Sequence, residues 1–333
     1  MALIKGTNSG ETIYGYASND EIYGFGGNDK IYGYEGHDFI SGGAGNDTLY
    51  GGSGDDDIYG DSGINTLVGG SGDDWFRTSA RSTGLSDDYI ADFELGYDRI
   101  DLRNWGVSDF TQVQALLSNT SDGGSILNAY AGGESHVIEI ADVTRSEFIS
   151  GDFVFDTSTA ARNLSGSSSV DVLFGGRGHD LIDGNGGSDR LLGGLGDDDI
   201  YGESGNDQIW GGIGSDLMSG GSGDDVFRFV SISEMNSASG RDVITDFQVN
   251  DGFGYDDLID FSQIDADTTR AGNQAFDFIG RDGFISNSPG ELRYAYSSAG
   301  DTVIAGNIDN DSAAEFQIVL IGRHVLDASD FIV

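Results

Sequence analysis

Aspartates recur at one position of a nine-residue pattern, and carboxylates in so regular a series suit metal binding. They are Asp20, Asp29, Asp38, Asp47, Asp56 and Asp74 in a first series, and Asp171, Asp180, Asp189, Asp198, Asp207, Asp216 and Asp225 in a second. Glu11 and Asn65 occupy the same position in the first series. Carboxylate and carbonyl oxygens form a hard-oxygen site, whose flexible coordination number suits Ca²⁺ better than Mg²⁺.

The elements that must position these carboxylates are short strands. Nonapeptides run without interruption from Gly6 to Arg77 and again from Gly166 to Arg228, with an apolar residue two positions after each acidic one. Glycine permits the tight turn, and the residues around the apolar position have strand character. Two nonapeptides then make one coil, and stacked coils make a parallel β-roll. We therefore expect an all-β chain of two parallel β-rolls, each followed by a β-rich cap.

This geometry predicts which carboxylates are neighbours. Repeat i should stack on repeat i+2 at one strand spacing, roughly 4.8 Å. Carboxylates at that spacing repel unless a cation lies between them. Counting such pairs along both arrays gives on the order of 11 calcium ions if each pair holds one. The sites that involve Glu11 and Asn65 are the ones whose occupancy these substitutions put in doubt.

The segments that follow the arrays predict the caps. DDYIADFELGYDRIDL (87–102) alternates apolar and polar residues, which indicates two strands around a turn, and further strands are expected at 136–140 and 153–155. A short amphipathic helix should follow an N-cap at Ser108. RDVITDFQ (241–248) and YDDLIDF (255–261) repeat the first pattern after the second array. We expect a tandem duplication with domains at 1–157 (β-roll 6–77) and 158–333 (β-roll 166–228).

Charge limits the partners. There are 57 acidic and 16 basic residues, so the formal net charge is −41. Nucleic acid and anionic membrane surfaces are therefore poor partners, and no nucleic acid is expected to bind, since phosphate binding needs clustered Lys and Arg. There is no Cys, no apolar run of about 18 residues that would predict a transmembrane segment, and no cleavable N-terminal signal. Because Met1 leads directly into the first repeat, we expect no domain ahead of it.

No catalytic residue is predicted. None of the four histidines lies in H-E-x-x-H, and G-x-S-x-G does not occur. Asp309 and Asp311 resemble the start of a calcium loop, but its Gly and distal Glu are missing, so a turn is expected. The residue after each apolar position is often aromatic, which predicts outward ladders of Tyr14, Tyr32 and Tyr50, of Tyr23 and Tyr59, and of Phe174 and Trp210. They serve either coil packing or a platform for sugar rings or a partner.

The repeats resemble the G-G-x-G-x-D-x-U-x nonapeptide of repeats-in-toxin (RTX) hemolysin-type calcium-binding proteins. GNQAFDFIG (272–280), GELRYAY (290–296), GNIDNDSAAEFQIVL (306–320) and the terminal DFIV resemble the serralysin C-terminal domain. That resemblance implies an uncleaved C-terminal signal read by type I secretion machinery. The array-plus-cap units are similar to the regulatory modules of mannuronan C5-epimerases.

Together these observations predict a secreted, extracellular, non-catalytic protein that folds on binding calcium after type I export. Its expected role is adhesion, matrix organisation or partner binding, with a polysaccharide or a cell surface as the partner. Two alternatives stay open. The chain could be a polysaccharide-binding module that accompanies an epimerase-like enzyme, or it could be an enzyme with an unrecognised site in the caps.

Overall fold

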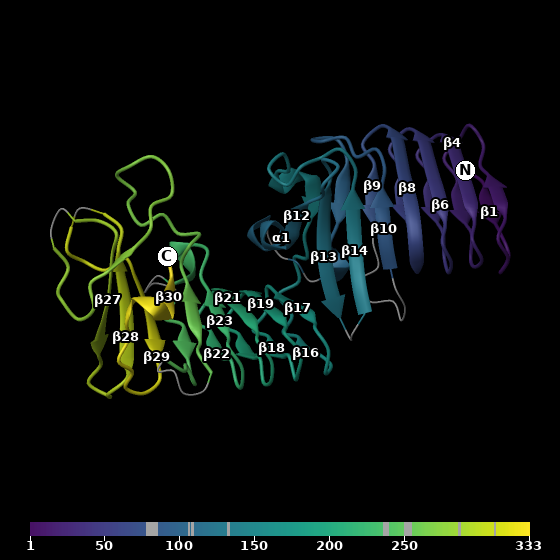
Figure 1. Cartoon of the computed structure of the whole chain (residues 1–333). Coiled ribbons are helices and arrows are strands. Elements are labelled where there is room, and N and C mark those ends of the chain that lie inside the picture. The colour runs from purple at the N-terminus through teal and green to yellow at the C-terminus, as the bar shows by residue number, and fades with distance from the viewer. Residues whose placement is uncertain are drawn as a thin grey trace. The chain divides into compact units, whose positions relative to one another are not determined.

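The computed structural model describes residues 1–77, 86–105, 107, 110–131, 134–235, 240–249, 255–285, 288–309 and 311–333. The chain forms two compact units, Met1–Thr157 and Ser158–Val333. In each unit a stack of short strands is followed by a cap (Figure 1). The predicted helix N-cap, Ser108, lies outside the described residues.

One nonapeptide shows why the sequence folds into coils. Strand β5 (Phe39–Ser41) has three residues, and its central Ile40 is fully buried between two partly exposed neighbours. The turn before the next strand contains Gly45 at φ 135°. A Cβ on Gly45 would lie 2.1 Å from the carbonyl oxygen of Gly27 in the coil below. The coils therefore approach one another at a distance that only glycine allows at this turn.

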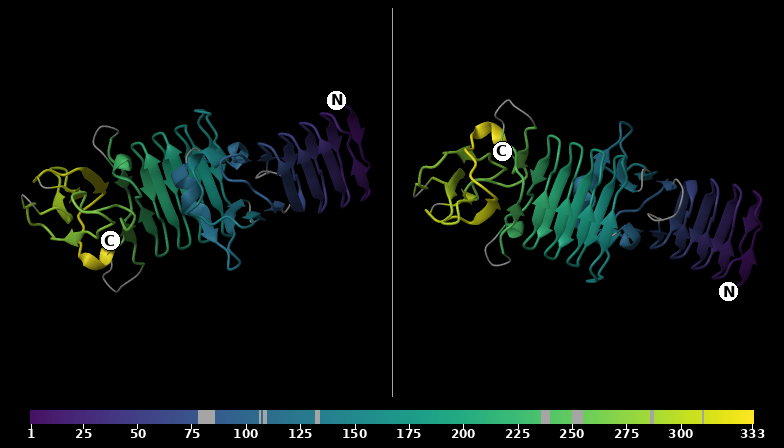
Figure 2. Two further views of the ribbon diagram at one scale, coloured as in Figure 1. Left: turned by 90° about the horizontal axis from the view of Figure 1, so that it is seen from above. Right: turned by 90° about the horizontal axis from the view of Figure 1, so that it is seen from below.

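The strands of the first unit form two sheets that are parallel throughout the array (Figure 2). Ile22, Ile40, Ile58 and Phe76 are successive partners in one sheet, each 18 residues from the next. Within the described residues, that sheet has the order β1 (Leu3–Lys5), β3 (Glu21–Tyr23), β5, β7 (Asp57–Tyr59), β9 (Trp75–Arg77), β11 (Arg99–Asp101) and β15 (Phe153–Val154). The other has β12 (Leu117–Asn119), β13 (Ser125–Ala131), β14 (Glu134–Ile140), β10 (Ser86–Ile90), β8 (Gly63–Ser71), β6 (Thr48–Ser53), β4 (Lys30–Glu35) and β2 (Thr12–Tyr14).

The second unit repeats this plan. Ile182 pairs with Ile200 and Ile200 with Met218, again at 18-residue spacing. As far as the chain is described, one sheet contains β16 (Asn163–Ser165), β18 (Leu181–Asp183), β20 (Asp199–Tyr201), β22 (Leu217–Ser219), β24 (Val243–Ile244), β29 (Phe316–Leu320), β28 (Thr302–Asn307), β27 (Glu291–Tyr296) and β26 (Asp277–Phe278). The other contains β17 (Val172–Gly176), β19 (Arg190–Leu195), β21 (Gln208–Ile213), β23 (Val226–Arg228), β25 (Leu258–Asp260) and β30 (Phe331–Ile332).

The caps continue the rolls before they depart from them. Strand β10 pairs in parallel with β8 and β11 with β9; in the second unit, β24 pairs with β22 and β25 with β23. Antiparallel strands then follow, β12 to β14 in one cap and β27 to β29 in the other. Among the described residues, the helices are α1 (Phe110–Leu116) and the 3₁₀ turns η1 (Arg103–Trp105), η2 (Ser150–Asp152), η3 (Ile232–Glu234) and η4 (Ala328–Asp330). The predicted all-β class with parallel β-rolls is confirmed.

The apolar position of every repeat supplies the core. Its side chains are at most 7% exposed, and they are Ile13, Ile22, Ile31, Ile40, Leu49, Ile58, Leu67 and Phe76 in the first array, and Leu173, Ile182, Leu191, Ile200, Ile209, Met218 and Phe227 in the second. Each roll is thus held by at least one buried apolar residue per strand, with Phe174, Leu192 and Trp210 buried in addition in the second roll. The acidic residues lie at the turns. No helix in the described part of the chain is long and apolar enough to cross a membrane.

Candidate metal centre

The structure brings the predicted aspartates together in four series. In each series, one side-chain oxygen, Oδ1, accepts a hydrogen bond from the main-chain N–H of the residue at the equivalent position one coil earlier. The distance from Asp20 N to Asp38 Oδ1 is 2.7 Å, and that from Asp38 N to Asp56 Oδ1 is 2.8 Å. The series are Glu11–Asp29–Asp47–Asn65, Asp20–Asp38–Asp56–Asp74, Asp171–Asp189–Asp207–Asp225 and Asp180–Asp198–Asp216.

The second carboxylate oxygen, Oδ2, is what makes these series suited to a cation. In the described structure it is buried and has no hydrogen-bond partner in Asp29, Asp38, Asp47, Asp56, Asp74, Asp189, Asp198, Asp207, Asp216 and Asp225. These residues are at most 3% exposed. A buried carboxylate oxygen without a partner is costly, and a cation removes that cost.

Main-chain oxygens approach the same places. A Cβ built on Gly24 would lie 2.4 Å from the carbonyl oxygen of Gly42 and 2.5 Å from Asp29 Oδ2. The same construction on Gly42 gives 2.9 Å to Gly60 O and 2.4 Å to Asp47 Oδ2. A carboxylate and a carbonyl oxygen thus converge beside each of these glycines. This donor set is the one that calcium prefers, so the residues present fit the ion.

The electrostatics of the metal-free fold agree with this geometry. Burial raises the pKa of Asp56 to about 7, and the charges of Asp74 and Asp38 add to the effect, against the hydrogen bond from the Asp38 backbone. Burial likewise raises the pKa of Asp198 to about 7 and that of Asp38 to about 6. Near neutral pH a substantial fraction of these carboxyl groups is therefore protonated, unless a bound cation stabilises the ionised form.

The two substituted positions differ from the ten aspartates whose Oδ2 is open. The Glu11 carboxylate accepts hydrogen bonds from the Thr7 hydroxyl and, at 3.1 Å, from Thr7 N, within its own turn. Asn65 accepts from Asp47 N at 3.0 Å, as an aspartate would, but its amide donates to Asp88 Oδ1 at 2.9 Å. Two aspartates near the start of their arrays resemble Glu11, because Asp20 Oδ2 accepts from Tyr16 N at 2.7 Å and Asp171 Oδ2 from Ser167 N at 2.6 Å.

Sequence reasoning missed carboxylates in the caps that extend the series. Asp98 Oδ1 accepts from Asp74 N, Asp242 Oδ1 from Asp216 N, and Asp257 Oδ1 from Asp225 N, each at 3.0 Å. Asp88 pairs with Asn65. The signal was present, because D-x-I occurs at 88–90, 98–100, 242–244 and 257–259, with the spacing from acidic to apolar residue that the repeats use.

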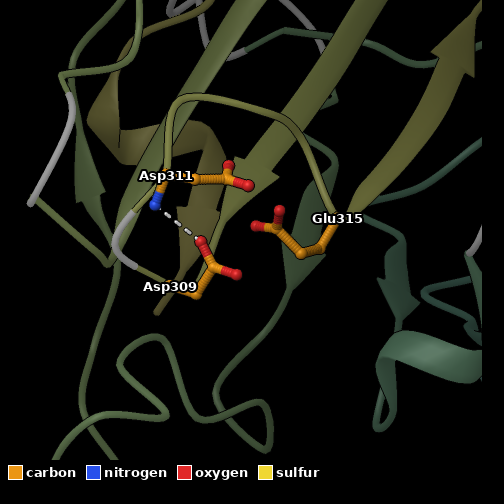
Figure 3. A group of neighbouring side chains, drawn as sticks. All are labelled: Asp309, Asp311 and Glu315. Atoms are coloured by element: carbon orange, nitrogen blue, oxygen red, sulfur yellow. Dashed lines mark hydrogen bonds between the residues drawn. The ribbon is translucent and has the colours of Figure 1, made fainter.

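A further acidic group lies in the second cap (Figure 3). Asp309, Asp311 and Glu315 present ligand atoms within 4.8 Å of one another. A turn was expected here because no distal Glu stood at the calcium-loop spacing, yet Glu315 does lie beside the two aspartates. Asp309 accepts from Asp311 N at 2.8 Å, and Glu315 accepts from Ile308 N at 2.8 Å. The group combines a hydrogen-bonded turn with a cluster of three carboxylates.

Aromatic ladders form on the first array. Tyr32 stacks on Tyr14 at 5.5 Å between ring centroids and on Tyr50 at 4.8 Å, with planes 10° and 7° apart. Tyr23 and Tyr59 flank Phe39 at 5.3 and 5.0 Å. The prediction of an outward ladder in the second array is wrong. Phe174 and Trp210 are 4% and 7% exposed, and the intervening position holds buried Leu192, so this row is apolar and buried along its length.

Comparison with known proteins finds a family model that matches both arrays. The family model for the RTX calcium-binding nonapeptide repeat (4 copies) matches residues 5–40, 32–67, 59–80, 165–200 and 192–227. The two arrays are RTX calcium-binding repeats. No curated protein matches the chain.

Three solved structures are similar to this chain. Two are solution structures from the Azotobacter vinelandii mannuronan C5-epimerase. The AlgE6R3 subunit is 24% identical to this chain and has a TM-score of 0.33. The alignment covers 53% of this chain and 80% of the subunit. The AlgE6R2 subunit has 24% identity, TM-score 0.31, and coverage of 53% and 93%. The third is the extracellular lipase LipA from Serratia marcescens, with 18% identity and TM-score 0.31. It aligns with 98% of this chain, which spans 40% of the lipase.

Proposed function

We propose that this RTX protein is secreted and that calcium is its folding switch. The buried, unpartnered Oδ2 atoms of the aspartate series carry the proposal, because a folded array without cations would leave them uncompensated. At low calcium the arrays would be loose. Extracellular calcium modules typically bind at about 10⁻⁴ to 10⁻³ M, so the chain would fold outside the cell, where a ligand of the folded state stabilises it by mass action.

The residues that would hold the ions are the aspartates of the four series together with the turn carbonyl oxygens. When bound, calcium supplies positive charge between carboxylates. About 11 ions would contribute roughly +22 and reduce the net charge of −41 to about −19. Since self-repulsion opposes the compact state, this reduction favours folding.

The C-terminal segment supports export by a type I system. In the fold, β30 (Phe331–Ile332) pairs with β25, so the terminal strand is part of the cap. A signal at Asp330–Val333 would therefore be accessible before folding and packed afterwards. The same switch that folds the arrays outside the cell would thus leave the signal exposed inside. With no catalytic residue predicted, we propose an adhesion, matrix or partner-binding role.

A calcium titration of the full chain tests this function. Far-UV circular dichroism should show a cooperative gain of β-structure at submillimolar to millimolar calcium, and magnesium at equal concentration should not substitute. A chain that shows the same β-sheet spectrum in chelator as in calcium would contradict the folding switch.

The tyrosine ladder favours a polysaccharide as the partner. Tyr14 is 55% exposed and begins the stacked row, and Lys30 Nζ lies 5.3 and 5.4 Å from the rings of Tyr32 and Tyr50. Aromatic rings beside a cation suit the apolar faces and carboxylates of an acidic sugar polymer.

Calorimetry with alginate tests this choice of partner. Binding in millimolar calcium, absent in chelator, should be lost when Tyr14, Tyr32 and Tyr50 become Ser. Serines at the exposed Tyr97 and Tyr255, which lie outside the ladder, form the control. Full binding by the triple variant would reject the ladder as the site, and a chemically modified polymer would instead indicate an enzyme.

A further inference from the structure

The two caps join their arrays through equivalent strands but differ at one position of the carboxylate series. Residues 88–93, which include the end of β10, and residues 242–247, which include β24, share the pattern D-x-I-x-D-F. Asp88 begins the first pattern and pairs with Asn65, and Asp242 begins the second and lies beside Asp216. An amide therefore stands in the first unit where a second carboxylate stands in the other.

In the first unit this junction is closed by a side-chain hydrogen bond. The Asn65 amide donates to Asp88 Oδ1 at 2.9 Å, and Asn65 Oδ1 accepts from Asp47 N at 3.0 Å. Of this pair only Asp88 carries a carboxyl group, whose Oδ1 is bonded to the amide and whose Oδ2 is buried without a hydrogen-bond partner in the described structure.

In the second unit the same junction contains two buried carboxylates. Asp242 is fully buried and Asp216 is 1% exposed. The main-chain N–H of Asp216 donates to Asp242 Oδ1 at 3.0 Å. The Oδ2 atoms of both residues are buried without a hydrogen-bond partner among the described residues. Two carboxyl groups are thus held side by side, each with one oxygen open.

At the opposite edge of each roll, the cap carboxylate that ends the series has both oxygens in hydrogen bonds. Asp98 accepts from Asp74 N at 3.0 Å and, with its other oxygen, from Glu94 N at 2.8 Å. Asp257 accepts from Asp225 N at 3.0 Å and from Gln248 N at 2.8 Å. Both oxygens of these cap carboxylates have main-chain donors. Of the four cap carboxylates that extend the series, Asp242 is the one that combines an open oxygen with a carboxylate neighbour.

We propose that Asp216 and Asp242 together hold one further calcium ion at the junction of the second array and its cap, and that the first unit has replaced this ion with the Asn65–Asp88 hydrogen bond. The inference rests on the proposed binding of calcium by the arrays and goes beyond them, because one ligand comes from the cap. The ion would tie β24 to β22, in addition to their main-chain pairing, and so strengthen the docking of the second cap on its array.

The number of calcium ions bound per chain tests the proposal. Native mass spectrometry of the full chain at saturating calcium should give one ion fewer for Asp242→Asn than for the parent. Asp88→Asn, the equivalent change in the first unit, should leave the number unchanged. Equal numbers for the parent and Asp242→Asn would overturn the inference, as would loss of one ion from both variants. A parent that binds no calcium would instead refute the function proposed for the arrays.

A second pair of variants decides the matter if Asp242→Asn does not fold. Asn65→Asp recreates the paired carboxylates in the first unit, and Asn65→Asp combined with Asp88→Asn removes the cap ligand again. The single variant should bind one ion more than the double variant, because any gain at the array site with Asp47 is common to both. The same number in both variants would overturn the proposal.

Discussion

Replacing Asp56 with Asn should change stability in opposite directions with and without calcium. Asp56 lies in the middle of the Asp38–Asp56–Asp74 series, is 2% exposed, and accepts from Asp38 N at 2.8 Å. An asparagine can keep that hydrogen bond, since Asn65 accepts from Asp47 N in the same way. The substitution therefore removes the charge and one open oxygen and retains the ladder.

The size of the effect follows from the pKa. Burial, with the charges of Asp74 and Asp38, raises the pKa of Asp56 from 3.8 to about 7 in the calcium-free fold. Three pKa units correspond to about 4 kcal/mol against the ionised form. Because the folded state binds the proton more tightly than the unfolded state, stability without calcium falls as pH rises from about 4 to about 7. Asn escapes this loss, so the calcium-free variant should gain up to about 4 kcal/mol at pH 8 and almost nothing at pH 4.

In calcium the sign should reverse, because Asp56 would be a ligand shared with both of its neighbours. Urea unfolding followed by tryptophan fluorescence measures the calcium-loaded case. Because the arrays are expected to be loose in chelator, the calcium-free case is measured from the concentration of a stabilising osmolyte that is needed to fold the chain. A Trp210→Phe background leaves Trp75 and Trp105, both in the first unit, as reporters. Asp55→Asn is the control, because it removes the same charge from a side chain that is 56% exposed. A change of the same sign in chelator and in calcium would refute the reasoning.

Three further outcomes are expected. Calcium should bind less well on acidification, because burial raises the pKa values of Asp38 and Asp198 to about 6 and about 7; the calcium midpoint in circular dichroism should rise between pH 7.5 and 5.5, and a constant midpoint would contradict this. Gly205→Ala should lower the free energy of unfolding by about 3 kcal/mol or more, because φ of Gly205 is 140° and the new Cβ would lie 1.4 Å from Gly187 O. Gly283→Ala is the control, because its Cβ would have no atom within 4 Å, and it should leave the urea unfolding curve unchanged. Tyr32→Ala should cost the calcium-loaded protein about 2 kcal/mol or more, because it loses ring stacks on Tyr14, Tyr34 and Tyr50. Unchanged unfolding would show that the ladder does not stabilise the roll.

The repeat period made most of the fold predictable. Glycine turns and one apolar residue per strand left a single way to bury Ile22, Ile40 and Ile58 together, so the register of 18 residues followed from the sequence. The pairing of acidic residues across coils followed from the same register. Local pattern and tertiary packing agree here, which is why the sequence reading succeeded.

The site was harder to predict where the period ends. Asp98, Asp242 and Asp257 extend the series from strands outside the nonapeptide pattern, and only the D-x-I spacing marks them. Glu315 reaches Asp309 and Asp311 through the fold of a loop, which no spacing rule states. The burial of Trp210 was also missed, because a β-strand pattern alone does not show which outer face is covered.

The 18-residue register also constrains how such a chain can change in length. Removing one nonapeptide would transfer every downstream carboxylate, and the cap with it, to the other side of the roll, while each repeat still found a partner. Removing a full coil of 18 residues would shorten the roll and leave each later residue on its original side. Gain or loss of repeats in steps of two therefore preserves the orientation of the cap relative to the first coil, and single steps reverse it.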